Sequence, residues 1–299
     1  MPSHKILRIF PSDVLTRQLL RKELSISPIL SQILINRGMN SVEAANEFLN
    51  INTEKLLDPY SFREMQKAVS IVKRCAELKQ KVLVFGDYDV DGITSVALLK
   101  DTLNRCGVEC IHHLPHRIKD GYGLCKDIVQ LAKKNNVKLV ITADCGISNY
   151  KEIEGLRREG IDVIVTDHHE SRSEALPCAS SIINPKLKDS NYGFRDLAGV
   201  GVAFKFAQAL SGSKLFEDLD LVALGTIADN APLTGENRIV AKQGLLRLSN
   251  TRRPGLRALI ENAGIENRKF TSTSVSFIIA PRLNASGRID TAETSLKLL

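Results

Sequence analysis

Residues 81–95, KVLVFGDYDVDGITS, decide the fold of this chain. The run 82–85 consists of valine, leucine and phenylalanine, which is typical of a short buried strand. Aspartates follow directly at positions 87, 89 and 91, and a segment with helical character then runs to Gly107. A strand, an acidic loop and a helix in this order predict the first unit of a parallel sheet.

Further aliphatic runs repeat this theme along the chain. VKLVIT (137–142), IDVIVT (161–166) and SSIIN (180–184) each read as a strand, and a further strand is expected at 108–114. Helical segments of 10–14 residues separate them, such as 149–160. Short strands that alternate with helices predict an α/β fold with a doubly wound, mainly parallel sheet covered on both faces.

The segments on either side of the sheet are helical. Residues 61–80 carry apolar side chains at 65, 69, 72 and 76, and Ser41 is placed to cap a helix. From about residue 199 nearly everything reads as helix. We therefore expect a mainly helical lead-in over 1–78, a catalytic α/β domain over 79–235 and a helical extension over 236–299.

Composition narrows the class of protein. The 299 residues carry 41 Lys and Arg against 34 Asp and Glu, so the net charge is +7, which permits a polyanionic partner. None of the six cysteines forms a CxxC pair, which argues against a zinc ribbon or a disulfide framework. Neither a signal-peptide core nor an apolar run long enough for a membrane span occurs. We expect a cytoplasmic protein that does not associate with membranes.

Metal-competent side chains follow three of the predicted strands and one helical run. They are Asp87, Asp89 and Asp91 after the first strand, Asp144 after 137–142, Asp167, His168 and His169 after 161–166, and Asp229 at the end of a helix. Because ligands of open parallel sheets bind beyond the carboxyl ends of the strands, these loops are expected to converge. Carboxylates with an imidazole suit divalent cations, Mn²⁺ first and Mg²⁺ as the alternative.

Such a constellation is suited to hydrolysis of a phosphoester. Two divalent ions that share a carboxylate lower the pKa of a water and neutralise charge on the phosphoryl oxygens. Asp144 lies between the other motifs in the expected sheet order and is our candidate for the shared ligand. His169, next to a ligand histidine, would donate to the scissile phosphate.

Several segments resemble a known superfamily. GDYDVDGITS (86–95), ITADCGI (141–147), VTDHHE (165–170) and GTIADNAPL (225–233) are similar to the successive motifs of DHH phosphoesterases. More narrowly, the chain resembles RecJ-type single-strand-specific 5′→3′ DNA exonucleases. The segments that carry this narrower resemblance are 34–49, LPHRIKDGYGL (114–124), LAGVGVAFKFAQAL (197–210) and PRLNASGRI (281–289).

The resemblance implies roles for the matching positions. Asp89 and Asp91 would each hold one of two Mn²⁺ ions, with Asp87 assisting and Asp144 bridging. His168 would be a ligand, Asp229 would complete the second site, and His169 would face the scissile phosphate. The implied activity is processive release of 5′ mononucleotides from single-stranded DNA in recombination and repair. A single-strand-binding protein and a helicase are the implied partners.

Four further residues are candidates for contacts with DNA. Arg117 precedes the glycine-rich turn KDGYGL, and Arg282, Asn284 and Arg288 lie close to a turn of small residues that we expect within 281–289. Guanidinium groups match phosphate oxygens through paired donors. We therefore expect these side chains to contact the phosphates of the strand.

Two other functions remain open. One is a DHH phosphoesterase that acts on short oligonucleotides or cyclic dinucleotides, and the other is a noncatalytic, DHH-derived scaffold that binds DNA. RecJ-type enzymes also continue into a second domain with a glycine-histidine-rich motif, which does not occur in this sequence. We therefore expect the chain as given to bind metal but to be a weak or nonprocessive nuclease.

Overall fold

The computed structural model describes residues 13–117, 120–171, 173, 175–266, 268–289 and 291–299. The chain forms two compact units, one ending at Asn52 and the other spanning Thr53–Leu299. The smaller unit contains α1 (Val14–Leu24), α2 (Pro28–Asn36) and α3 (Val42–Leu49). Leu20, Leu34 and Ala45 form its core. Ser41 accepts a hydrogen bond from the amide of Ala44, which confirms it as the N-cap of α3.

The larger unit is built on a five-stranded parallel sheet in the order β2-β1-β3-β4-β5. The strands are β1 (Lys81–Gly86), β2 (Cys110–His113), β3 (Val137–Ala143), β4 (Asp162–Thr166) and β5 (Ser181–Ile183). All five coincide with the runs predicted from sequence, to within a few residues at their ends. The predicted α/β class and parallel sheet are confirmed.

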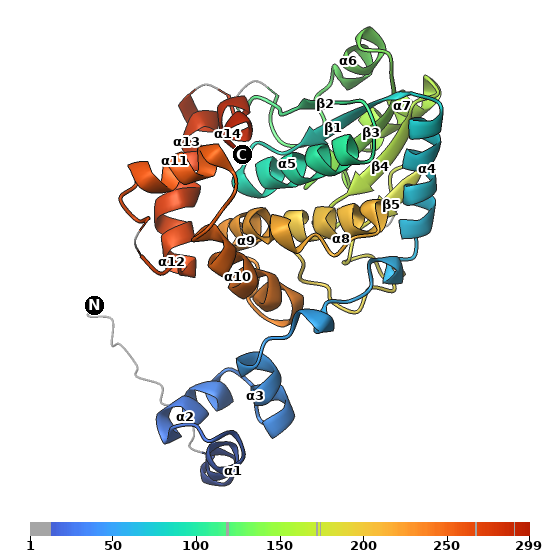
Figure 1. The fold of residues 1–299 in the computed structure, drawn as a ribbon. Helices are drawn as coiled ribbons and strands as arrows, with labels where there is room; N and C mark the ends of the chain where they lie inside the picture. The colour runs from blue at the N-terminus through green and yellow to red at the C-terminus, as the bar shows by residue number, and fades with distance from the viewer. Residues whose placement is uncertain (1–12, 118–119, 172, 174, 267, 290) are drawn as a thin grey trace, which may run out of the picture. The chain divides into compact units, whose positions relative to one another are not determined.

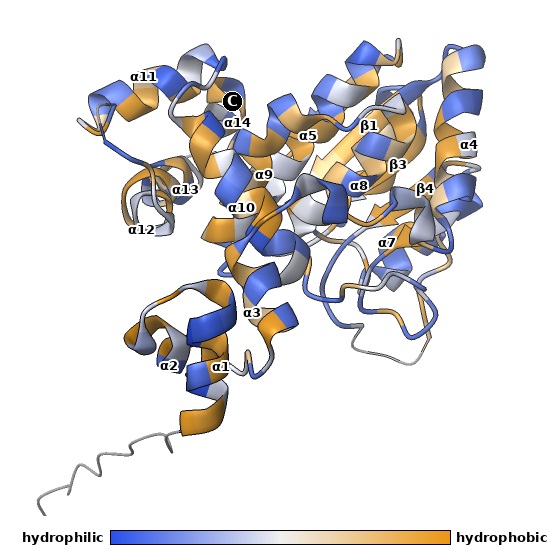
Figure 2. Ribbon diagram, turned by 60° about the horizontal axis from the view of Figure 1, so that its bottom comes forward, coloured by the Kyte–Doolittle hydropathy of each residue, from blue (hydrophilic) through white to orange (hydrophobic). Residues whose placement is uncertain are grey.

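Helices cover both faces of this sheet (Figure 1). On one face, α4 (Met65–Glu77), α5 (Val90–Arg105) and α8 (Gly199–Ser211) pack against alternate strand residues such as Val84 and Ile141. On the other face, α6 (Ile128–Lys134) and α7 (Tyr150–Arg158) pack against residues such as Phe85 and Val140. Hydrophilic and hydrophobic residues are interleaved along α4 in Figure 2, as expected for a helix with one buried side.

Helices also form the rest of the larger unit. They are α9 (Leu219–Ala228), α10 (Gly235–Leu248), α11 (Pro254–Asn262), α12 (Ser272–Ser274), the π-helical turn η4 (Val275–Ile279), α13 (Ala280–Ile289) and α14 (Glu293–Leu298), with short 3-10 turns η1 (Thr53–Lys55), η2 (Pro59–Ser61) and η3 (Phe216–Asp218). A second apolar core joins α9 and α10 to these later helices. None of the described helices has both the length and the apolar character needed to cross a membrane.

The turn expected within 281–289 was wrong, because these residues belong to α13. Their small side chains serve packing. A Cβ placed on Gly287 would lie 3.5 Å from the carbonyl oxygen of Tyr88, so the helix approaches the loop after β1 closely. Arg282 and Arg288 therefore project from a helix that borders the acidic loop.

Candidate metal centre

Three aspartates begin side by side at the carboxyl edge of the sheet. Asp87 follows β1, Asp144 follows β3 and Asp167 follows β4. Their amides continue the strand ladder, because Asp87 donates to Ala143, Asp144 to Thr166 and Asp167 to Ile183, at 3.0 to 3.2 Å. The sheet itself therefore aligns the three backbones from which the acidic side chains project.

Asp89 and Asp91 extend this centre from the start of α5. Asp89 caps the helix, accepting a hydrogen bond of 3.0 Å from the amide of Gly92. Asp91 is buried, and its two carboxylate oxygens accept hydrogen bonds from the amides of Gly199 (2.7 Å) and Val200 (2.8 Å) at the start of α8. The positive end of the α8 dipole thus stabilises the carboxylate of Asp91.

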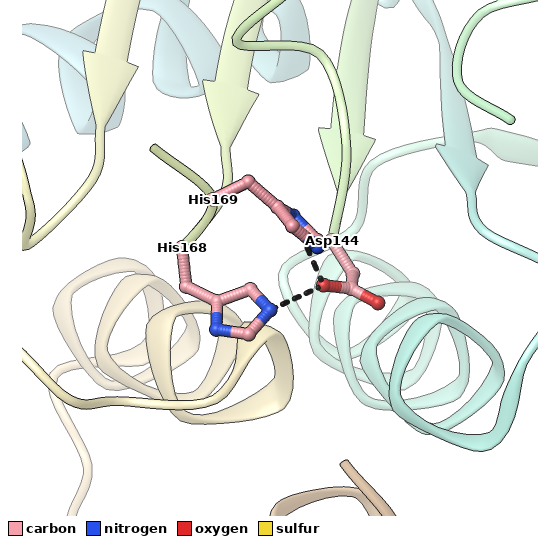
Figure 3. Close-up of side chains that lie close together, drawn as sticks. All are labelled: Asp144, His168 and His169. Carbon is pink, nitrogen blue, oxygen red and sulfur yellow. Dashed lines mark ion pairs between the residues drawn. The ribbon is translucent and has the colours of Figure 1, made fainter. Parts of the chain in front are cut away.

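Asp144 and His168 meet at the middle of the centre (Figure 3). Asp144 has a left-handed backbone, with φ of 64°, and its buried Oδ1 lies 3.1 Å from Nε2 of His168. Nδ1 of His168 is 3.1 Å from the carbonyl oxygen of Leu197 and donates to it. A proton held on Nδ1 leaves a lone pair on Nε2, which is the form that ligates a metal.

The described side chains provide three groups of donors, each with all its ligand atoms within 4.8 Å of one another. They are Asp87, Asp89 and Asp144; Asp91, His168 and Asp229; and Asp144, His168 and His169. The first two groups share no residue and are joined by the short Asp144–His168 contact. Because Oδ1 of Asp144 and Nε2 of His168 are both buried without a hydrogen-bond partner, the residues present fit a pair of divalent cations.

The ionisation of this centre follows from its burial. Burial, together with the neighbouring carboxylates, raises the pKa of Asp87 and Asp91 to about 7 and that of Asp229 to about 6. The same causes raise the pKa of Asp144 well above its ordinary value. Burial lowers the pKa of His168, which keeps its imidazole neutral. Clustered acids that resist ionisation are the electrostatic signature of a cation site, because a cation would offset their repulsion.

His169 lies at the rim and is held from one side of its ring. Nδ1 is 2.8 Å from Oδ1 of Asp167 and 3.0 Å from the hydroxyl of Tyr122. Burial lowers the pKa of His169, but the hydrogen bond and charge of Asp167 outweigh it and raise that pKa overall. The side chain is 44% exposed, so Nε2 is left available to a substrate.

Sequence reasoning assigned no role to Asp167, Tyr122 or Gly199. Asp167 is fully buried and accepts from the amides of Ile147, His168 and His169 besides the ring of His169. The signal for Tyr122 was its place between Gly121 and Gly123, both of which have positive φ. The hydroxyl of Tyr122 also donates to the carbonyl oxygen of Asp144, at 3.3 Å.

The four predicted DNA contacts lie outside the three donor groups. Arg117 is exposed and stacks over the ring of Tyr88, 5.3 Å from its centroid. Arg282 is exposed and donates to the carbonyl of Ile278 within its own helix, at 2.8 Å. Arg288 is exposed and Asn284 half-buried on the same helix. Their contact with DNA stays a prediction.

A family model matches the part of the chain that contains most of this centre. Residues 81–226 match the DHH family, N-terminal domain. The single-stranded-DNA-specific exonuclease RecJ of Bacillus subtilis (strain 168) is 40% identical over 280 residues, which cover 94% of this chain and 36% of that protein. RecJ of Escherichia coli (strain K12) is 38% identical, covering 92% of this chain and 50% of that protein.

Solved structures agree with this match. A crystal structure of exonuclease RecJ bound to manganese superposes with a TM-score of 0.74 at 35% identity, covering 81% of this chain and 62% of that one. RecJ from Thermus thermophilus in complex with Mg²⁺ gives 0.68 at 28% identity, covering 96% and 38%. The chain thus spans half or less of the length of the two curated relatives.

Proposed function

This chain belongs to the DHH family and matches RecJ proteins over more than nine-tenths of its length, and from that premise we propose that it is a metal-dependent exonuclease of single-stranded DNA. The reaction would be hydrolysis of phosphodiester bonds from the 5′ end, with release of 5′ mononucleotides.

One observation carries this proposal. Two three-residue donor groups lie at the carboxyl edge of the sheet and are joined by the contact of 3.1 Å between Asp144 and His168. Divalent cations held there would supply activation of a water and neutralisation of charge on the phosphoryl oxygens. Asp144 would be the shared ligand, because it is the carboxylate that belongs to two of the donor groups and touches His168.

The protein's own groups would orient the phosphate. Asp167 fixes the ring of His169 and favours its protonated form. A protonated His169 that faces outwards would donate a charge-assisted hydrogen bond to the scissile phosphate. The amides of Gly199 and Val200 hold Asp91 in place, so its carboxylate needs little reorganisation on binding a cation.

Finer features of the proposal rest on weaker support. Mn²⁺ is our expected metal, because an imidazole nitrogen belongs to one of the two separate donor groups. By family resemblance, the role would be in DNA recombination and repair in the cytoplasm, with a single-strand-binding protein and a helicase as partners. The domain boundaries at 78/79 and 235/236 also stay predictions.

The test is cleavage of a single-stranded oligonucleotide in Mn²⁺, with parallel substrates labelled at the 5′ or the 3′ end. We expect a labelled mononucleotide to appear at once from the 5′-labelled strand, and a matching duplex to resist. Asp144→Ala should abolish cleavage, while Asp127→Ala, which changes an exposed aspartate that makes no capping hydrogen bond, should not.

The same assay separates the alternative functions. Cleavage of only short oligonucleotides or cyclic dinucleotides would favour another DHH phosphoesterase. Equal cleavage by the wild type and Asp144→Ala would exclude the proposed centre. Binding of DNA with no cleavage in Mn²⁺ or Mg²⁺ would favour a noncatalytic scaffold.

A further inference from the structure

A cavity of about 610 Å³ adjoins the metal centre. It lies between the loop that follows β4 and the loop that follows β5. Its lining includes His169, Ser171, Leu176, Lys186, Leu187 and Lys188. His169 belongs both to this lining and to a donor group of the metal centre, so the cavity opens beside the place proposed for the scissile phosphate.

The two walls of the cavity are tied together by a buried asparagine. Asn184, just after β5, is 1% exposed. Its Nδ2 donates to the carbonyl oxygen of His169, and its Oδ1 accepts from the amide of Lys186, each at 2.9 Å. The position of Lys186 relative to His169 is therefore set by the fold.

The charges around the cavity are not balanced. Its two carboxylates have partners outside it, since Glu170 lies 3.9 Å from Arg195 and Asp189 is bonded to Arg63. Lys186 and Lys188 have no ion-pair partner within the parts of the chain that the structure describes. The cavity thus presents two uncompensated ammonium groups to an incoming ligand.

Charge and shape together indicate the class of ligand. Two ammonium groups and the hydroxyl of Ser171 suit a phosphate, whereas Leu176 and Leu187 offer an apolar surface to a base or sugar. The volume lies within the range of small-molecule sites. We propose that this cavity binds one nucleotide of the DNA strand, next to the scissile phosphodiester, with its phosphate on Lys186 and Lys188. This inference rests on the proposed function and assigns that site a nucleotide subsite.

The test measures binding without catalysis. Isothermal titration in EDTA with dTMP and with tetrathymidylate would compare the wild type with Lys186→Ala/Lys188→Ala. Lys138→Ala is the matched control, because Lys138 is an exposed lysine near the opposite end of β3. We expect the double variant to bind both probes at least about tenfold more weakly. Its dependence of log affinity on log salt should flatten by about 0.7 for each phosphate that no longer pairs with a lysine.

Two further variants keep the outcome decisive. Lys186→Arg should retain binding, which separates loss of charge from loss of structure. A double variant that binds dTMP as tightly as the wild type, or a wild type that binds neither probe, would overturn the inference. If the wild type binds dTMP through these lysines but does not cleave DNA in Mn²⁺, the subsite stands and the proposed nuclease activity fails.

Discussion

Oδ2 of Asp91 accepts a hydrogen bond of 2.7 Å from the amide of Gly199, the first residue of α8. The same glycine also makes room for a second acid. A Cβ added at 199 would lie 2.4 Å from Oδ1 of Asp144. The start of α8 therefore supports two carboxylates that belong to different donor groups of the metal centre.

Gly199→Ala should weaken binding of Mn²⁺ by at least about tenfold, or about 1.4 kcal/mol. The added methyl group would displace Asp144 or shift the amide that holds Asp91. Isothermal titration with Mn²⁺ checks this. Gly201→Ala is the matched control, because its Cβ would meet only the side chain of Leu197, at 3.1 Å. Equal losses in both variants would mean that the helix, and not the metal centre, was disturbed.

Tyr122→Phe should lower kcat by about two- to tenfold, since a hydrogen bond of this kind contributes about 0.5–1.5 kcal/mol. The hydroxyl helps to hold the ring of His169 but lies in none of the donor groups. Affinity for Mn²⁺ should therefore be unchanged. Single-turnover cleavage and metal titration measure the two quantities.

Tyr60→Phe serves as the control for Tyr122→Phe, because the hydroxyl of Tyr60 bonds to the carbonyl of Ala209, which belongs to α8 near its C-terminal end. The effect of Tyr122→Phe should also disappear in a His169→Ala background. An undiminished effect in that background would show that Tyr122 acts on something other than His169.

The stabilisation of the protein by Mn²⁺ should grow between pH 6 and pH 8. Asp87 and Asp91 have pKa values of about 7 in the folded chain, against the ordinary value of 3.8, so the metal-free fold binds protons that the unfolded chain has released. Its stability consequently falls as pH rises from about 4 to about 7. Mn²⁺ competes with these protons and offsets the repulsion.

Scanning calorimetry with and without Mn²⁺ at the two pH values checks this dependence. The increase in Tm on adding Mn²⁺ should be larger at pH 8 than at pH 6. A constant increase, or a larger one at pH 6, would contradict the assigned carboxylates as the metal ligands.

Glu236→Ala should destabilise the larger unit by about 3–5 kcal/mol, the cost of leaving a buried charge without its partner. Glu236 is 2.6 Å from Nζ of Lys205, and both side chains are almost completely buried. It also accepts from the amide of Leu57 and is bonded to the hydroxyl of Tyr192.

Urea unfolding measures this loss. Replacing the pair together, as Lys205→Met/Glu236→Leu, should cost less than Glu236→Ala, because no uncompensated charge remains. A double variant that is less stable than the single one would show that the polar contacts of Lys205 and Glu236 matter more than their charges.

Much of the fold could be predicted from the sequence, because its signals are local. Aliphatic runs such as 82–85 and 137–142 predicted strands, and the acids directly after them fell at the carboxyl edge of the sheet. Contacts between distant segments could not be predicted in this way. The bond from Gly199 to Asp91 spans 108 residues, and that from Tyr122 to His169 spans 47.

The error at 281–289 has the same origin. Alanine, serine and glycine at 285–287 are typical of a turn when read locally. In the fold, the small residue Gly287 lets α13 approach Tyr88 closely, and a packing requirement that arises in the tertiary structure overrides the local preference.

The number of Mn²⁺ ions bound per chain tests the central claim most directly. Equilibrium titration of the metal-free wild type, with the ions counted by elemental analysis, should give two, and Asp144→Ala should retain at most one because it removes the ligand that joins the two donor groups. A wild type that binds no ion or only one, or an Asp144→Ala variant that still binds two with unchanged affinity, would contradict the two-cation centre.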